Sequence, residues 1–352
     1  MPMGAAIFME DIMLRSLTIA LAASVALIAV PATAATLNGA GGTAIYPVLS
    51  VWAKDYQAKN GTAVNYQSIG SGGGIKQIEA KTVDFANSDK PLLHDDIVKN
   101  NLVQFPQVVI SIVPVVNLPG IHAGQLTIDG PTLADIFLGK ITKWNDPALK
   151  KLNPKVNLPD MAILVVHRSD GSGTTFNFTN YLGKVSPDWQ KNVGSDTSVS
   201  WPVGLGGKGN EGVASNVRQT TGAIGYVEYA YATQNAMTYM AMINADGKRV
   251  LPTMSAFQAA AGNANFNGVQ DFYLILTNQP GAKSWPITAA TYMLMRKDYA
   301  ADKNGRVLKF LDYALHDGTA ASQKLFYVPF PEAIVKQIEA SWTASFGSDA
   351  WK

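Results

Sequence analysis

Three glycine-rich loops of this 352-residue chain combine glycine with hydroxyl side chains in a pattern that suits a bound anion. They are Gly39–Thr43, Gly70–Gly74 and Gly171–Thr174, and each is expected to follow a strand and to lead into a helix. At such a junction backbone N–H groups are unpaired and the helix dipole adds partial positive charge. Glycine allows close approach of the backbone, and Ser or Thr adds a hydroxyl donor. A single loop of this kind is more often only a capped helix start, but three of them favour an anion site.

One arginine and two carboxylates accompany these loops. Arg168 ends a predicted strand two residues before Asp170, so it could bind an anion through two N–H groups while Asp170 holds it in place. A surface salt bridge is the alternative. Asp89 could simply cap the helix that follows it. In an anion site it would repel a fully ionised ligand such as sulfate, whereas it could accept a hydrogen bond from an anion that carries a proton, such as hydrogen phosphate. A site that demands one hydrogen bond can discriminate by about 10⁴–10⁵.

Composition excludes several other kinds of chemistry. The chain has no Cys, and its four His residues lie far apart in the sequence, so we expect no disulfide, no thiol nucleophile, no metal centre and no cofactor. A formal net charge of +2 argues against a basic nucleic-acid-binding face. The nucleotide-binding pattern Gly-x-x-x-x-Gly-Lys-Ser/Thr is absent, and neither Ser71 nor Ser172 has the preceding glycine of a serine-hydrolase elbow.

The N-terminal residues have the three-part layout of a secretory signal peptide. Arg15 precedes an apolar stretch, Leu17–Val30, which is followed by the small-residue pattern Ala32–Ala34. The stretch is shorter than the about 20 residues that a membrane-spanning helix needs. Residues 1–34 are therefore predicted to be a cleaved signal peptide, and without a Cys for a lipid anchor the mature protein is expected to be free in the periplasm.

The mature chain reads as strands that alternate with helices, which predicts α/β structure with parallel sheets covered on both faces. Its length suggests two domains, and a chain with 47% apolar and 15% charged residues is not disordered. Glycines dominate Trp201–Gly212, which is predicted to be a loop. Lys208 and Asn210 in this loop could touch a ligand or lie near the rim of its site. The predicted strands are Val64–Gln67, Val83–Ala86, Phe105–Asn117, Ile163–His167, Ala223–Val227, Ile287–Met295 and a short one that opens at Leu37.

From about Leu37 to Trp342 the sequence resembles the phosphate-binding proteins of high-affinity bacterial ABC phosphate transporters. The stretches that carry the resemblance are Leu37–Thr43, Ile69–Gly74, Val83–Asp89, Arg168–Thr174, Gly204–Asn210 and Gly222–Tyr229. The resemblance implies the two-lobed type II periplasmic binding protein fold, in which each lobe is a sheet flanked by helices and two hinge crossovers join the lobes. Lobe I would be residues 36–111 and 286–352, and lobe II would be residues 112–285.

The same resemblance implies that the protein is no enzyme but a monomeric receptor that captures inorganic phosphate between its lobes and delivers it to a membrane-embedded ABC permease. No cofactor, metal or nucleic acid would take part. Asp89 would accept the phosphate proton, and Asp170 would steady Arg168. The phosphate ligands carried over from the family are Thr43, Ala44, Ser71, Asp89, Arg168, Ser172, Gly173 and Thr174. Ala44 departs from the family, which usually has Phe there; the backbone N–H is kept and the aromatic packing is lost.

Two other functions stay open from the residues alone. An exported phosphatase could use Ser71 or Ser172 as its nucleophile, although no histidine or metal cluster stands beside either in the sequence. A receptor of the same design could be tuned to sulfate, molybdate or arsenate. Asp89 disfavours fully ionised anions, whereas arsenate carries a proton at neutral pH as phosphate does.

Overall fold

The computed structural model describes residues 36–348, 350 and 351, so the predicted signal peptide lies outside the described residues. Nowhere in the described part does a helix have the length and apolar character needed to cross a membrane. The strands are β1 (Leu37–Gly41), β2 (Val64–Ser68), β3 (Phe85–Ser88), β4 (Leu102–Val116), β5 (Thr127–Ile128), β6 (Leu164–Arg168), β7 (Leu205–Gly207), β8 (Ala223–Glu228), β9 (Thr238–Tyr239), β10 (Ala241–Ile243), β11 (Arg249–Val250) and β12 (Thr288–Arg296).

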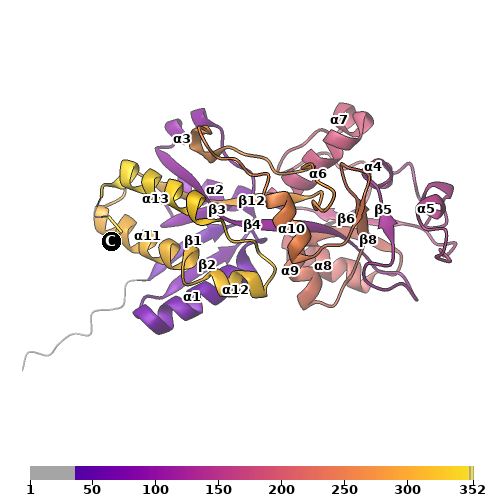
Figure 1. The fold of residues 1–352 in the computed structure, drawn as a ribbon, viewed down its shortest axis with the longest axis horizontal. Helices are drawn as coiled ribbons and strands as arrows, with labels where there is room; N and C mark the ends of the chain where they lie inside the picture. The colour runs from indigo at the N-terminus through magenta and orange to yellow at the C-terminus, as the bar shows by residue number, and fades with distance from the viewer. Residues whose placement is uncertain (1–35, 349, 352) are drawn as a thin grey trace, which may run out of the picture. The chain divides into compact units, whose positions relative to one another are not determined.

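Helices alternate with these strands along most of the chain (Figure 1). They are α1 (Tyr46–Asn60), α2 (Ser71–Glu79), α3 (His94–Lys99), α4 (Gly130–Phe137), α5 (Pro147–Leu152), α6 (Gly173–Val185), α7 (Pro187–Asn192), α8 (Gly209–Gln219), α9 (Tyr229–Gln234), α10 (Met254–Ala261), the 3₁₀ helix η1 (Gln270–Phe272), α11 (Ala301–Leu315), α12 (Thr319–Lys324) and α13 (Glu332–Phe346).

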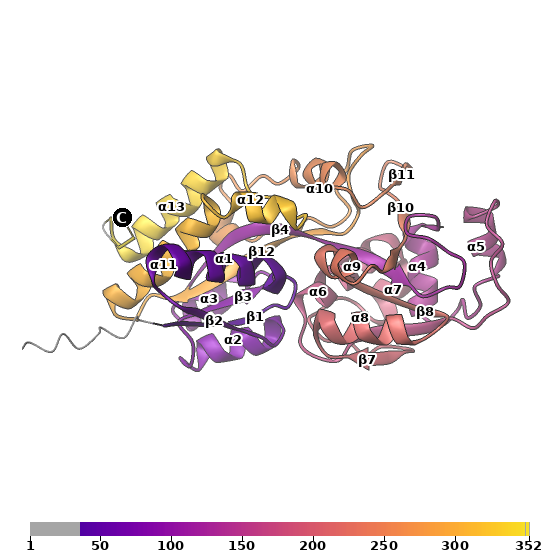
Figure 2. The ribbon, with the colours of Figure 1, turned by 90° about the horizontal axis from the view of Figure 1, so that it is seen from below.

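A nine-stranded sheet in the order β2-β1-β3-β12-β4-β8-β6-β7, with β9 also paired to β4, forms the frame of the described chain. Its longest strand, β4, is buried along all 15 residues and changes partner midway. Up to Ser111 it pairs with β12, and from Ile112 onward it pairs with β8 (Figure 2). We call β1–β3 and β12 with α1–α3 and α11–α13 the β12 side, and β6–β8 with α4 and α6–α9 the β8 side.

The structure corrects two predictions from the sequence. The sheet is mixed rather than parallel, because β12 lies antiparallel between β3 and β4, and β4 runs antiparallel to β8. The segment Trp201–Gly212 is not simply a loop, since it contains β7 and the start of α8. A three-residue strand rich in glycine gives no apolar alternation by which it could be recognised.

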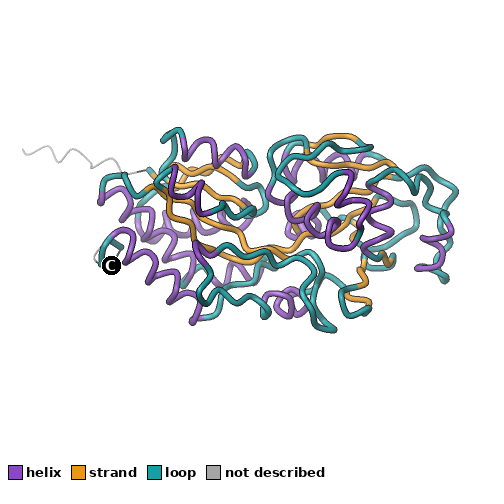
Figure 3. Tube along the Cα trace, turned by 90° about the horizontal axis from the view of Figure 1, so that it is seen from above, coloured by secondary structure: helices purple, strands orange, loops and turns teal. Residues whose placement is uncertain are grey.

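Helices lie on both faces of the strands (Figure 3), as expected for right-handed crossovers that lead from β1 to β2 and from β2 back to β3. Pro47 occupies the first turn of α1, and Gly61 ends that helix with a left-handed φ of 73°. Aromatic pairs fill the core on each side: Phe105 meets the ring of Trp342 edge-on on the β12 side, and Phe178 stacks on Tyr226 on the β8 side. These pairs pack α13 against β4 and α6 against β8.

Candidate functional site

Helix N-termini from both sides of the sheet meet at one place. α1 and α2 follow β1 and β2 on the β12 side, and α6 and α8 follow β6 and β7 on the β8 side. Hydrogen bonds connect their first residues: the N–H of Gly72 donates to the carbonyl of Gly171 (2.9 Å), and the N–H of Asn210 donates to Oγ1 of Thr43 (3.1 Å). The three glycine-rich loops predicted from the sequence are therefore brought together, each at the start of a helix.

Thr43 lies in the β1–α1 loop and is buried, with its hydroxyl oriented by Asn210. Its Oγ1 accepts from the backbone N–H and from Nδ2 of Asn210, the latter at 2.7 Å. Because both hydrogen bonds use the oxygen as acceptor, the hydroxyl hydrogen remains available to donate. The carbonyls of Thr43 and Ala44 accept hydrogen bonds from the hydroxyls of Tyr231 and Tyr327, at 2.8 and 2.7 Å. Ala44, the departure from the family pattern, is itself buried.

Ser71 stands at the start of α2 and joins the two sides of the sheet. Its Oγ accepts from the N–H of Asp89 (3.2 Å) and from the N–H of Gly173 (3.0 Å), so its hydrogen is also free to donate. A Cβ at Gly173 would lie 2.6 Å from both Oγ of Ser71 and Cβ of Asp89. The close approach of α6 to these residues therefore requires glycine at this position.

Asp89 follows β3 and does not cap the next helix, because α3 begins only at His94 and has no side-chain cap. Its side chain is buried, and Oδ1 accepts from Thr291 (2.8 Å) while Oδ2 lies 3.4 Å from the hydroxyl of Thr174. Burial raises the pKa of Asp89 to about 6, although the hydrogen bond from Thr291 and the charge of Arg168 favour the ionised form. Asp89 is thus a carboxylate at neutral pH.

Thr291 was not predicted as a site residue, and a bulge in the sheet explains its position. Thr291 lies opposite Val108 on β4 whereas Tyr292 lies opposite Pro106, so the register shifts between them. Tyr292 also pairs with Ser88 at the end of β3, which places Thr291 beside Asp89. Nδ2 of Asn87 donates to Oγ1 of Thr291 (2.9 Å), and the Thr291 hydroxyl has two acceptors, Oδ1 of Asp89 at 2.8 Å and Oδ1 of Asn87 at 3.1 Å, of which Asp89 is the nearer.

Arg168 ends β6 and is held by Asp170, as predicted, but the bidentate pair that was expected with the anion is formed with Asp170 instead. Its Nε and Nη2 donate to the two carboxylate oxygens of Asp170, at 2.8 and 2.6 Å, while both side chains are largely buried. Burial alone would raise the pKa of Asp170, but the hydrogen bonds and charge of Arg168 outweigh it and the pKa is lowered. Nη1 of Arg168 is buried without a hydrogen-bond partner in the described chain. A buried, charged donor of this kind is suited to an anionic acceptor.

Ser172 and Thr174 complete the predicted set from the N-terminus of α6. Ser172 is the N-cap of this helix, because its Oγ accepts from the N–H of Thr175 at 3.0 Å. The capping interpretation is therefore correct for Ser172, and its hydroxyl hydrogen is still free for a ligand. Thr174 is buried between Asp89 and Asn210. All predicted ligand residues lie in this one constellation.

Asn210 also belongs to the site. The sequence left open whether it touches a ligand or lies near the rim. It is fully buried at the start of α8, where the N–H of the preceding residue, Gly209, donates to Oδ1 of Asp170 (2.9 Å). The N–H of Glu228 donates to Oδ1 of Asn210 (2.9 Å), which directs Nδ2 toward Thr43. The run Gly206–Gly209 before a helix has the same design as the three predicted loops, and this signal could have identified the fourth.

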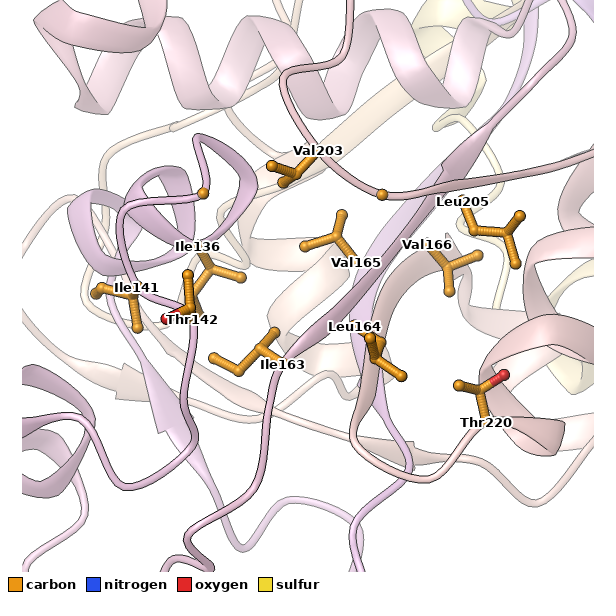
Figure 4. Close-up of a pocket in the computed structure, with 12 residues that line it drawn as sticks. Ile136, Ile141, Thr142, Ile163, Leu164, Val165, Val166, Val203, Leu205 and Thr220 are labelled. Carbon is orange, nitrogen blue, oxygen red and sulfur yellow. The ribbon is translucent and has the colours of Figure 1, made fainter.

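Other features of the described residues do not suit this chemistry. A separate pocket of about 340 Å³ on the β8 side is lined by aliphatic side chains such as Ile136, Val165 and Leu205 and by no charged residue (Figure 4). A possible metal-binding group, Asp312, His316 and Glu339, lies on α11, just after it and on α13, and its members pair with one another. Neither includes a residue of the anion-binding constellation.

The constellation offers many donors and a single ionised acceptor that faces them. The hydroxyls of Thr43 and Ser71 and Nη1 of Arg168 can donate to oxyanion oxygens. Oδ2 of Asp89 can accept, whereas the Asp170 carboxylate is occupied by Arg168 and Gly209. An oxyanion that carries one proton matches this set, because it accepts at most of its oxygens and donates at one.

Comparison with known proteins agrees with this geometry. A family model described as the PBP superfamily domain matches residues 29–317. The chain is 53% identical over 311 residues to the phosphate-binding protein PstS of Xylella fastidiosa, covering 88% of this chain and 85% of that protein. It is 50% identical over 324 residues to PstS of Pasteurella multocida, covering 91% and 94%.

A solved structure confirms the predicted type II periplasmic binding protein fold. A high-affinity periplasmic phosphate-binding protein, PfluDING, bound with phosphate, superposes with a TM-score of 0.69 at 21% identity and covers 87% of this chain and 93% of its own. Matches of 50–53% identity over most of both chains are far stronger than a shared fold requires. The chain belongs to the PstS family of phosphate-binding proteins.

Proposed function

We propose that this protein captures inorganic phosphate at the constellation around Asp89 and Arg168 and delivers it to a membrane-embedded ABC permease. It would be exported to the periplasm by the N-terminal signal peptide and act there as a monomer without cofactor or metal. Residues 36–111 with 286–352, and residues 112–285, would act as two lobes hinged near Val109–Pro114 and Trp285–Pro286. The change of partner along β4 at Ser111–Ile112 supports a hinge at the first of these crossovers.

One observation carries this proposal: a buried carboxyl group, that of Asp89, faces a set of buried donors. Sulfate has no proton for Asp89 at neutral pH, so the two like charges would repel each other without a compensating hydrogen bond. Hydrogen phosphate and dihydrogen phosphate donate to Oδ2 and accept at their remaining oxygens. Arsenate has the same protonation and is expected to compete.

The geometry favours a receptor over a phosphatase. The Oγ atoms of Ser71 and Ser172 accept hydrogen bonds from backbone N–H groups, and neither has a histidine or carboxylate partner in the described chain. A serine nucleophile needs such a base to take its proton. The supporting relatives are named as binding proteins.

Equilibrium dialysis of the mature protein with labelled phosphate at micromolar concentration tests the proposal. We expect one phosphate retained per chain, displaced by unlabelled phosphate and arsenate but not by sulfate. Absence of retained phosphate at these concentrations would refute the proposed function. Hydrolysis of a chromogenic phosphate ester that Ser172→Ala abolishes would favour the phosphatase instead.

A further inference from the structure

A fully buried carboxyl group lies behind the phosphate-binding loops and has no assigned role. Glu228 ends β8, and its Oε2 accepts from the N–H of Ala230 (2.8 Å) and lies 3.1 Å from the hydroxyl of Tyr327. Oε1 is buried and has no hydrogen-bond partner in the described chain. The residue lies opposite Ile112 of β4, where that strand changes partner.

The surroundings of Glu228 favour a neutral carboxylic acid. No lysine, arginine or histidine of the described chain forms an ion pair with it, and an unpaired buried charge is costly enough that the group instead takes up a proton. The titratable groups that interact electrostatically with it are Asp89, Tyr229, Tyr231 and Tyr327. Burial raises the pKa of Glu228 well above its ordinary value; the hydrogen bonds from Ala230 and Tyr327 oppose the rise, and the charge of Asp89 adds to it.

The hydrogen bonds around Tyr327 can all be satisfied when Glu228 carries a proton. The Tyr327 hydroxyl has one hydrogen and two acceptors within reach, the carbonyl of Ala44 at 2.7 Å and Oε2 of Glu228 at 3.1 Å. If Glu228 carries a proton, it can donate to Tyr327, and Tyr327 can donate to Ala44. If Glu228 is ionised, it competes with the Ala44 carbonyl for the only hydrogen.

We propose that Glu228 in its neutral form is a positioning residue for phosphate binding. Through Tyr327 its side chain fixes the backbone of Ala44. Its backbone N–H, whatever the protonation of the side chain, also donates to Asn210, which orients the hydroxyl of Thr43. Both targets belong to the loop that supplies the first predicted ligands, so this inference rests on the proposed function. Ionisation of Glu228 at alkaline pH releases Tyr327 from Ala44 and adds negative charge behind the anion.

A second tyrosine–glutamate pair on the same loop is a matched control. The Tyr231 hydroxyl donates toward the carbonyl of Thr43 (2.8 Å) and lies 2.7 Å from Oε1 of Glu211. Unlike Glu228, Glu211 is exposed to solvent. In both pairs a tyrosine hydroxyl lies between a backbone carbonyl of this loop and a glutamate. The carbonyl of Ala44 is paired with the buried Glu228, and that of Thr43 with the exposed Glu211.

The test is the ratio of phosphate dissociation constants, wild type over E228Q, measured by isothermal titration from pH 6 to pH 10. Glutamine is neutral and can donate to Tyr327, so we expect a ratio within about threefold of one up to pH 7.5. Because ionisation of Glu228 removes its donor to Tyr327, the ratio should rise at least threefold by pH 10. Titration of phosphate affects both proteins equally and cancels. The ratio of wild type to E211Q should stay constant across pH 8–10.

Two results would overturn the inference while leaving phosphate binding itself intact. One is a loss of affinity in E228Q at pH 7 as large as that in Glu228→Ala, which would show that the charge is needed. The other is a wild-type to E228Q ratio that stays constant to pH 10. If the wild type binds no phosphate at any pH, the proposed function fails instead.

If the wild type binds no phosphate, the protonation of Glu228 can still be tested by thermal unfolding of the ligand-free protein. A carboxyl group with a raised pKa stabilises the folded chain below the ordinary pKa, near 4.5, and loses this contribution as the pH rises toward the folded-state pKa. The Tm of wild type should therefore fall relative to that of E228Q by about 2 °C or more between pH 5 and pH 8. A constant difference in Tm would contradict a neutral Glu228.

Discussion

Asp89 illustrates how single atoms decide which anion the site accepts. Its Oδ1 accepts a hydrogen bond from Thr291 at 2.8 Å, whereas its Oδ2 has only a longer contact of 3.4 Å with the hydroxyl of Thr174 and can accept from a ligand. The hydroxyls of Thr43 and Ser71 can only donate to a ligand, because each of their oxygens already accepts two hydrogen bonds. The site can therefore distinguish a protonated from an unprotonated oxyanion without any difference in size between the two.

Replacing Asp89 by Asn should change how the stability of the ligand-free protein depends on pH. The pKa of Asp89 is about 6 in the folded chain and 3.8 ordinarily, so its stabilising contribution is complete below pH 3.8 and is lost as the pH rises to 6. The loss amounts to about 3 kcal/mol. The Tm of wild type should thus fall relative to that of Asp89→Asn between pH 4 and pH 7. Parallel curves for wild type and Asp89→Asn would contradict the assignment.

Arg168→Lys should weaken phosphate binding by about 10–100-fold, the cost of losing charge-assisted hydrogen bonds. Lysine keeps the charge but cannot bond to both oxygens of Asp170 and still present a further N–H to the anion. Titration calorimetry measures the change. Arg218→Lys, at an exposed arginine bonded to Asn235, is the matched control. Affinity within threefold of wild type would show that Nη1 of Arg168 does not bind the anion.

At the scale of elements, the helix N-termini are what the sequence predicts best. Each of the loops ending at Thr43, Gly74 and Thr174 could be recognised because a glycine run follows an apolar strand, and the structure places a helix start at each. Local chemistry alone determines such a junction, so no long-range information is needed. The signal for the fourth, before α8, was present in Gly206–Gly209 but was hidden by a strand of only three residues.

Long-range pairing accounts for what could not be predicted. β12 lies about 200 residues after β3 yet runs between β3 and β4, and no pattern within it specifies antiparallel partners. The position of Thr291 depends on this pairing and on a one-residue shift at Gln107, a residue of β4 that has no partner on β12. Asn210 and Thr291 entered the site through tertiary contacts rather than through a motif. The resemblance to a family supplied the predicted ligands, but it named neither of these two as one.

Two glycine substitutions should distinguish two kinds of contact. One is the contact between the β8 side and the β12 side of the sheet, and the other is the packing of α2 on β1 within the β12 side. Gly173→Ala would place a Cβ 2.6 Å from Ser71 and Asp89 on the β12 side, whereas alanine at a helix start is otherwise tolerated. We expect at least a tenfold loss of phosphate affinity with little change in Tm. Gly74→Ala would instead place a Cβ 2.4 Å from Cα of Gly41 within the β12 side and should lower the stability by about 1–3 kcal/mol.

Thermal unfolding and calorimetry on the same two preparations provide the comparison. Wild-type affinity in Gly173→Ala would contradict the close approach of α6 to Ser71. Unchanged Tm in Gly74→Ala would contradict the packing of α2 on β1.

At the scale of the whole molecule, β4 is the element that the two halves of the site share. Its first part pairs with β12, which supplies Thr291, and its last part pairs with β8, which ends at Glu228. The two strands that carry Thr291 and Glu228 are thus both paired to β4, one to its first half and one to its second half. A hinge in this strand would change the distance between Asp89 and Arg168 in a single motion.

The predicted signal peptide implies a defined mature terminus. Cleavage after Ala34 would leave Ala35 as the first residue, two positions before β1 begins at Leu37. Intact-mass spectrometry of protein recovered from the periplasm measures this directly. Recovery of a chain that retains Leu17–Val30 would contradict the predicted signal peptide.

The central claim, that Asp89 selects a protonated oxyanion, is tested most directly by isothermal titration of the mature protein with phosphate and with sulfate at pH 7.5, repeated with Asp89→Asn. For wild type we predict one phosphate per chain at micromolar affinity or better, a binding free energy of about −8 kcal/mol or stronger, and no heat from sulfate. Asp89→Asn should lose affinity for phosphate and admit sulfate. Sulfate binding by wild type as tight as phosphate binding would contradict the account.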